Sequence, residues 1–246
     1  MTLRLAVWSG PRNVSTALMY AFAQRGDTRV LDEPLYAAYL ARGEALDHPG
    51  REEVLSAQHT DAERVIEECL LGPCSAPVLM AKHMAHHLRG LEDAHGDGWP
   101  FLAHFTNVLL TRAPRAMLAS LAAKLAAPDL ADTGLVEQVA VLESLVAVGE
   151  TPIVITAEQV LADPTGALTA LCARVGIDFD PGMMSWLAGP KPYDGVWARH
   201  WYAGVHRSTG LSPLRATPRE LPAALEPLLA VCEPLHARLA AHVLGG

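Results

Sequence analysis

Long apolar runs, paired cysteines and an excess of positive charge are all missing from this sequence, and each absence removes a class of protein. No apolar run reaches the length of a membrane span. The four cysteines show no CxxC spacing, which favours free thiols over disulfides or a zinc site. The net charge of −8 argues against nucleic-acid binding through a basic surface. An anionic small ligand fits that charge only where positive side chains gather locally.

The start of the chain also lacks the pattern of a secretory signal, because its first four residues lead directly into a strand-like run. We therefore expect a soluble, cytoplasmic protein. Half of the 246 residues are apolar and 19% are charged, so a sizeable core can be buried. This length fits a single domain over residues 1–246. Oligomeric state is left open.

Alternating strand and helix patterns predict an α/β fold in three layers, with a central, mostly parallel five-stranded sheet flanked by helices. The predicted strands are Leu3–Ser9, Thr28–Asp32, Pro77–Ala81, Thr106–Thr111 and Pro152–Thr156. The predicted helices are Val14–Gln24, Asp61–Leu71, Pro114–Leu125, Gly134–Val148, Pro164–Val175 and Pro181–Leu187, with two more between Pro218 and Leu244. Gly189–Pro213 is predicted to be a long ordered loop, and such loops are usually functional.

The first strand is followed by a tight turn and then by a helix. Free N–H groups at a helix start, together with the helix dipole, favour a bound anion. Arg12 adds a guanidinium, and Ser15 and Thr16 add hydroxyl donors. A plain capped helix start with Pro11 in the turn is an equally good interpretation of the loop taken alone. The loop is not a complete Walker motif, so ATP chemistry is disfavoured.

A second basic site follows the fourth predicted strand. Arg112 stands at the carboxyl end of that strand, where ligands collect in open α/β sheets, and Ser120 lies in the second turn of the next helix. The alternative is an ordinary helix start at Pro114 with a surface Arg115 and a packing serine. One such site proves little by itself.

Taken in order, these segments resemble the sulfotransferase family. The first loop is similar to the family's 5′-phosphosulfate loop, and VLLTRAPRAMLAS (108–120) to its 3′-phosphate segment. ITAEQVLADPTGALTALCARVGIDFD (155–180) is similar to a strand-plus-helix segment of the family. The sequences at Asp32–Tyr36 and Lys82–His87 resemble a bacterial branch of this family. Related domains of that branch occur with branched-chain aminotransferase-like proteins.

The resemblance implies a P-loop NTP hydrolase-like fold of the sulfotransferase type. It implies 3′-phosphoadenosine 5′-phosphosulfate (PAPS) as cosubstrate, no metal, and a small-molecule acceptor with a hydroxyl or amine. The implied donor-binding residues are Gly10, Pro11, Arg12, Asn13, Val14, Ser15, Thr16, Arg112 and Ser120.

Two departures from the family pattern keep alternatives open. Val14 stands where the family's loop has a glycine. Arg12 stands where that loop has a lysine, so a planar guanidinium replaces a compact ammonium group. A catalytically silent nucleotide-binding module is therefore one alternative. A P-loop small-molecule kinase is the other.

Sulfuryl transfer needs a cation at the transferred group and a base for the acceptor's proton. Arg12 is our candidate for the cation. Glu33 is the first candidate for the base, because it follows the second strand at the carboxyl edge of the sheet. Lys82 with His83 or His86 occupies the place where better-known members carry a lysine and a histidine, so these histidines are rival bases. Solvated or capping histidines are the plainer interpretation, and the spacing predicts no metal site.

Within the long predicted loop, the stretch Lys191–Thr209 would close over the nucleotide. Arg207 and Ser208 would reach a phosphate, with Arg207 the better supported of the two. Trp197 and Trp201 would either stack on the adenine or fill gaps in the core, and the second interpretation is slightly preferred. The identity of the acceptor cannot be read from these residues.

Overall fold

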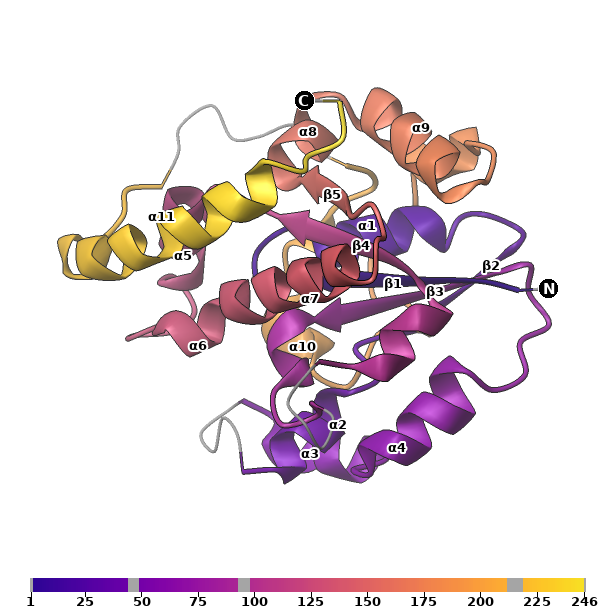
Figure 1. Cartoon of the computed structure of the whole chain (residues 1–246), viewed down its shortest axis with the longest axis horizontal. Coiled ribbons are helices and arrows are strands. Elements are labelled where there is room, and N and C mark those ends of the chain that lie inside the picture. The colour runs from indigo at the N-terminus through magenta and orange to yellow at the C-terminus, as the bar shows by residue number, and fades with distance from the viewer. Residues whose placement is uncertain (1, 44–48, 93–97, 212–218, 246) are drawn as a thin grey trace.

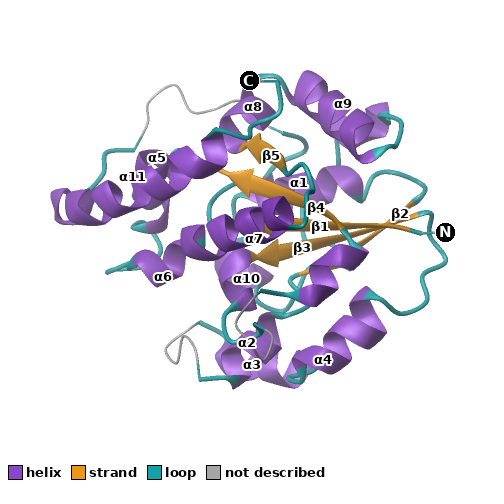
Figure 2. Ribbon diagram, in the orientation of Figure 1, coloured by secondary structure: helices purple, strands orange, loops and turns teal. Residues whose placement is uncertain are grey.

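A computed structural model describes residues 2–43, 49–92, 98–211 and 219–245 of the chain. Within them, five parallel strands form one sheet in the order β2-β3-β1-β4-β5 (Figure 2). The strands are β1 (Leu3–Ser9), β2 (Thr28–Asp32), β3 (Val78–Met84), β4 (Thr106–Thr111) and β5 (Ile153–Thr156). Their parallel pairing brings all the carboxyl ends to one edge of the sheet.

Helices cover both faces of the sheet (Figure 1). One face carries α1 (Ser15–Phe22), α8 (Ala157–Ala162) and α9 (Pro164–Val175), and the other carries α5 (Pro114–Leu121), α7 (Leu135–Ala147) and α11 (Glu226–Ala240). The prediction of a three-layer α/β fold with a five-stranded parallel sheet is therefore confirmed. No helix in the described ranges is long and apolar enough to cross a bilayer.

Shorter elements fill the connections. The remaining α-helices are α2 (Tyr36–Ala41), α3 (Arg51–Ala57), α4 (Ala62–Arg64), α6 (Leu130–Thr133) and α10 (Ala198–Trp201), and Val65–Leu70 is a π-helix. Turns of 3₁₀-helix occur at Ala85–Leu88, Pro100–His104, Pro181–Met184, Val205–Arg207 and Ala223–Leu225.

The first strand shows how the sequence builds two cores from one run of residues. Successive side chains of a strand point to opposite faces, so Leu5 and Val7 pack toward α1 whereas Ala6 and Trp8 pack toward α7. Because both faces are covered, the strand is almost continuously apolar, as expected for a parallel sheet. The alternation also fixes which residues at the end of each strand can face a given side.

The third strand is longer than the sequence pattern predicted. It continues past Ala81 to Met84, so Lys82 and His83 are strand residues that point to opposite faces. His83 is therefore part of the sheet and not of a turn or helix that follows it. His86 and His87 lie instead in the 3₁₀ turn that follows.

Other boundaries also differ. The helix predicted over Asp61–Leu71 is α4 continued by the π-helix, and the one predicted over Pro181–Leu187 is a single 3₁₀ turn. The long predicted loop contains α10 and another turn, and its last predicted residue, Pro213, lies outside the described residues. Of two helices predicted near the C-terminus, one is α11 and the other a 3₁₀ turn, and their predicted start, Pro218, also lies outside the described residues.

The segment 189–211 is fastened to α1 by a buried carboxylate. The Tyr20 hydroxyl lies 2.7 and 2.8 Å from the two carboxylate oxygens of Asp194, to which it donates. His206 Nε2 lies 2.9 Å from Asp194 Oδ2 on the other side. The Asp194 side chain is only 5% exposed, so each of these contacts replaces water that the carboxylate has lost.

Tyr20→Phe is expected to lower the free energy of unfolding by about 1.5–3 kcal/mol, since it removes a hydrogen bond to a buried charge and keeps the ring. Urea denaturation followed by circular dichroism measures the change. Ser56→Ala, which removes an exposed hydroxyl bonded to a backbone carbonyl, is the control and should cost much less. Equal losses in the two variants would contradict the role given to Asp194.

Candidate active site

A cavity of about 460 Å³ opens at the carboxyl edge of the sheet, a volume typical of small-molecule sites. Many of the residues singled out in the sequence line it: Pro11, Arg12, Val14, Ser15, Thr16, Glu33, Lys82, His86, Arg112, Ser120 and Ser208. Four others, Gly10, Asn13, His83 and Arg207, are described but do not line it. The structure thus brings the first loop and the second basic site to one cavity.

Gly10 and Asn13 hold the first loop against α6 and the end of β4. A Cβ atom on Gly10 would lie 2.4 Å from the carbonyl oxygen of Thr133, so only glycine allows this approach between the loop and α6. The buried side-chain amide of Asn13 donates to the carbonyl of Leu110, 3.3 Å away, at the end of β4. Both residues thus shape the loop, and their predicted contact with a ligand stays a prediction.

The backbone around the cavity is strained. Arg12, Val14 and Glu33 have φ values of 64°, 60° and 44°, and they are the non-glycine residues with positive φ among those described. This conformation is unusual for any residue with a Cβ atom and most unusual for a β-branched one such as Val14. The position where the family has a glycine therefore keeps the left-handed backbone that a glycine would favour. Strain of this kind concentrates at functional sites.

Arginine side chains gather at one end of the cavity, which we call the basic end. Arg12 Nε donates to Ser120 Oγ at 3.1 Å, and Arg112 Nη1 donates to the Arg12 carbonyl at 2.7 Å. Burial lowers the pKa of Arg12, and the charges of Arg219 and Arg112 lower it further. Burial also lowers the pKa of Arg112, again with a contribution from Arg219.

Arg12 and Arg112 are half-buried and Arg219 is exposed, and three positive charges that repel one another gain when an anion enters between them. Arg219 was missed by the sequence analysis because it stands in no motif. Only the folded chain brings its charge near enough to lower the pKa values of Arg12 and Arg112.

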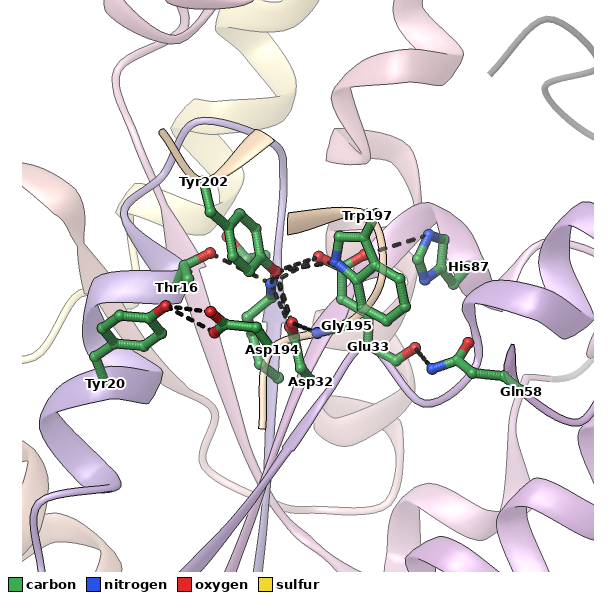
Figure 3. Close-up of polar contacts among 12 residues, drawn as sticks. Thr16, Tyr20, Asp32, Glu33, Gln58, His87, Asp194, Gly195, Trp197 and Tyr202 are labelled. Carbon is green, nitrogen blue, oxygen red and sulfur yellow. Dashed lines mark hydrogen bonds and ion pairs between the residues drawn. The ribbon is translucent and has the colours of Figure 1, made fainter. Parts of the chain in front are cut away.

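The other end of the cavity is built around the buried Lys82, whose partners Asp32, Glu33 and Tyr202 are labelled in Figure 3. Lys82 Nζ lies 2.7 Å from Asp32 Oδ1 and 2.6 Å from Glu33 Oε1, and it also donates to the hydroxyl of Tyr202. An ammonium group has three protons, and these three partners use them all. Thr16 Oγ1, at 3.3 Å, is a more distant fourth neighbour.

Tyr202 closes this network from the segment 189–211. Its hydroxyl donates to Asp32, whose two oxygens lie 2.8 and 2.9 Å away, and accepts the indole proton of Trp197 at 3.1 Å. The backbone N–H of Gly195 reaches Asp32 Oδ2 at 3.0 Å. Asp32 and Tyr202 were not among the predicted site residues.

The network holds two carboxylates against one ammonium group. Burial is the largest influence on Glu33 and raises its pKa; Asp32 adds to the increase, and Lys82 opposes it. Burial works against the charge on Lys82, but the two carboxylates outweigh it and raise its pKa. A carboxyl group with a raised pKa, next to a cavity, is suited to take a proton near neutrality.

The histidines separate into two groups. His83 is fully buried on the far face of the sheet, where its ring stacks on Trp8 with centroids 4.2 Å apart. Burial and the charge of Lys82 lower the pKa of His83 to about 3, so the structure removes it as a candidate base. His86 lines the cavity as predicted, and so does His87, which sequence analysis did not single out. His87 Nε2 lies 4.0 Å from Glu33 Oε2.

Aromatic rings line the same end of the cavity as Glu33, and we call this the aromatic end. Tyr36 stacks on His87 with centroids 4.7 Å apart and meets Trp197 edge-on at 5.0 Å. Tyr39 and the half-buried Trp201 also line it. Trp197 is therefore a core ring at the cavity wall, as the preferred interpretation of the sequence had it.

Comparison with known proteins places these observations in context. A family model described as "Sulfotransferase domain" matches residues 3–240. Two Arabidopsis thaliana proteins, branched-chain-amino-acid aminotransferase-like proteins 1 and 2, are 39% identical over 237 residues and 38% identical over 238 residues. Each match covers 96% of this chain and 41% of the relative, so the chain spans about two fifths of their length.

Two solved structures share the fold. A sulfotransferase domain from the curacin biosynthetic pathway aligns with a TM-score of 0.55 and 16% identity, covering 98% of both chains. A sulfotransferase from Alicyclobacillus acidocaldarius aligns with a TM-score of 0.53 and 15% identity, covering 98% of this chain and 95% of the other.

In the described residues no group of three or more His, Cys, Asp or Glu side chains could hold a metal ion.

Lys82→Met is expected to lower the free energy of unfolding by about 3–5 kcal/mol, because two buried carboxylates lose their counter-ion. Chemical denaturation measures the loss, with the exposed Lys124→Met as the control. Adding Glu33→Gln to Lys82→Met should restore part of the stability, since one uncompensated charge disappears. A double variant as unstable as the single one would argue against the charge balance described here.

Proposed function

We propose, because this chain belongs to the sulfotransferase domain family, that it transfers a sulfuryl group from PAPS to a hydroxyl or amine of a small-molecule acceptor. The single observation that carries this proposal is the shared cavity. Its basic end offers arginines to an anion, and its other end places a buried carboxylate beside a lysine. A donor and an acceptor could therefore meet inside one enclosed space.

The basic end would hold the two phosphate-bearing ends of the donor. The N–H groups at the start of α1, with Ser15 and Thr16, would surround the 5′-phosphosulfate. Arg112 and Ser120 would bind the 3′-phosphate, with Arg219 as a third cation that the electrostatic coupling brings into the same site. Ser208 lines the cavity and remains a candidate donor contact, whereas the exposed Arg207 does not line it.

The transfer would be an in-line displacement at sulfur. As the acceptor oxygen or nitrogen bonds to sulfur, Glu33 takes its proton and the bond from sulfur to the bridging oxygen breaks, leaving that electron pair on the phosphate. Arg12 and the loop amides would stabilise the charge on the bridging and sulfuryl oxygens. Lys82 would fix Glu33, because its three protons already have partners. His86 remains the rival base.

Two further expectations belong to the same proposal. The described stretch acts as one sulfotransferase-like domain in the cytoplasm, where its free cysteines, Cys69, Cys74, Cys172 and Cys232, stay reduced. No metal is needed, since the protein's own cations would offset the developing charge.

The desulfated donor, adenosine 3′,5′-bisphosphate, should stabilise the protein in a thermal-shift titration, by roughly 2.7 kcal/mol at a hundredfold excess over its Kd. Arg112→Ala should abolish most of this effect, because the 3′-phosphate loses its cation. Arg115→Ala is the matched control, since Arg115 lies on the surface in an ion pair with Glu226, and should respond like the unchanged protein. Stabilisation by ATP that requires Mg²⁺, without a response to the bisphosphate, would favour a kinase instead.

Glu33→Gln should reduce kcat by about 10²–10⁴-fold across an acceptor panel, assayed with radiolabelled donor, while bisphosphate binding persists. In the unchanged protein the rate should rise with pH through the raised pKa of Glu33, because the carboxylate acts only when ionised. This acid limb should vanish in the variant, whereas Glu53→Gln, at an exposed ion pair, should keep it. Bisphosphate binding without turnover of any acceptor would point to the catalytically silent module.

A further inference from the structure

The aromatic end of the cavity differs from the basic end in both charge and chemistry. The basic end contributes Arg12 and Arg112, whereas the other charged side chains that line the cavity in its described part are Glu33, Lys82 and Asp132. Two chemically distinct subsites therefore share one volume of about 460 Å³. The side chains of the second subsite indicate which kind of molecule binds there.

The aromatic end is negative in sum when Glu33 is ionised, the form in which it can act as a base. Lys82 then faces two carboxylates, Asp32 and Glu33, and this cluster has one excess negative charge. Asp132, on α6, is a further half-buried carboxylate of the cavity wall. A positive group on an acceptor would be attracted here, and the low polarity of the surroundings strengthens the attraction.

The rings at this end favour an organic cation over a hydrated metal ion. Tyr36, Tyr39 and Trp197 are buried and form a rigid wall, locked by their contacts with each other and with His87. Trp201, on α10, also lines the cavity but is only half-buried, so its indole is the most exposed of these rings. Indole faces attract ammonium groups more strongly than the other aromatic side chains do.

Building on the proposed function, we propose that the acceptor is a small alcohol that carries an organic cation, that is, an amino or quaternary-ammonium alcohol. Its cation lies against Trp201 and the excess carboxylate charge, and its hydroxyl points to Glu33. Glu33 receives the hydroxyl proton, the oxygen bonds to sulfur, and the electron pair of the broken bond leaves with the bisphosphate. The product is a zwitterionic sulfate ester with no net charge.

A cationic acceptor would also prepare the base that acts on it. Burial and Asp32 favour the protonated form of Glu33 in the empty cavity. A positive charge nearby favours the ionised form, so binding of the acceptor lowers the pKa of Glu33 and readies it to take a proton. A neutral alcohol of the same shape would lack this effect.

Choline and 3,3-dimethylbutan-1-ol form a matched pair for the test, because the two alcohols differ by one positive charge on an otherwise equal shape. Calorimetric titrations are run with each alcohol, both with saturating adenosine 3′,5′-bisphosphate and without it. The expected result is that choline binds about tenfold more tightly than the neutral alcohol. Equal or tighter binding of the neutral alcohol, or no binding of either, would overturn the inference.

Two variants show whether an aromatic ring supplies the preference. Trp201→Leu should reduce the ratio of the two affinities toward one, whereas Trp201→Phe, which keeps a ring, should preserve most of it. An unchanged ratio of the two affinities in Trp201→Leu would show that the Trp201 ring does not supply the preference for the cation. Failure of the bisphosphate to bind would count against the proposed donor, while the comparison of the alcohols without nucleotide still tests the cation subsite, so the two failures are distinguishable.

Discussion

The ammonium group of Lys82 joins parts of the chain that are far apart in sequence. It binds the end of β2 through Asp32 and Glu33, and through Tyr202 it binds the segment that follows α10. Removing a lysine charge from water is costly, and only several well-placed oxygens offset that cost. The shape of the cavity at the carboxyl edge of the sheet therefore depends on this buried cluster, because Glu33 and Tyr202 also line the cavity and Asp32 holds Tyr202.

Backbone strain accompanies the same site. Val14 and Arg12 hold the left-handed conformation in the first loop, and Glu33 holds it immediately after β2. Each of these costs of order 1–3 kcal/mol, which the surrounding fold must supply. The first loop is held by Asn13 and by the close approach of Gly10 to α6, and Glu33 is held by Lys82. The rigid core below the cavity thus fixes side chains that a flexible loop would not keep in place.

The sequence predicted the layered fold and the approach of Arg12 to Arg112, because apolar runs and strand-to-helix turns are local signals. Its limit is visible at Lys82 and His83, where a polar pair ended the predicted strand although both residues are buried within it. A lysine whose partners are distant in sequence cannot be told from a surface lysine by pattern alone. The same holds for Tyr202, which lines the cavity, and for Arg219, whose charge acts on Arg12 and Arg112, because neither position leaves a periodic trace in the sequence.

The segment 189–211 contributes to the cavity through Ser208 as well as through Trp197, Trp201 and Tyr202. It is fastened by Asp32 on one side and by the Tyr20–Asp194 contact on the other. A ligand that tightens or loosens this segment alters the wall that the other ligand meets. By thermodynamic linkage, any factor by which one occupant changes the affinity of the other must be matched by an equal effect in return, and the segment 189–211 is the part of the wall through which such an effect would pass.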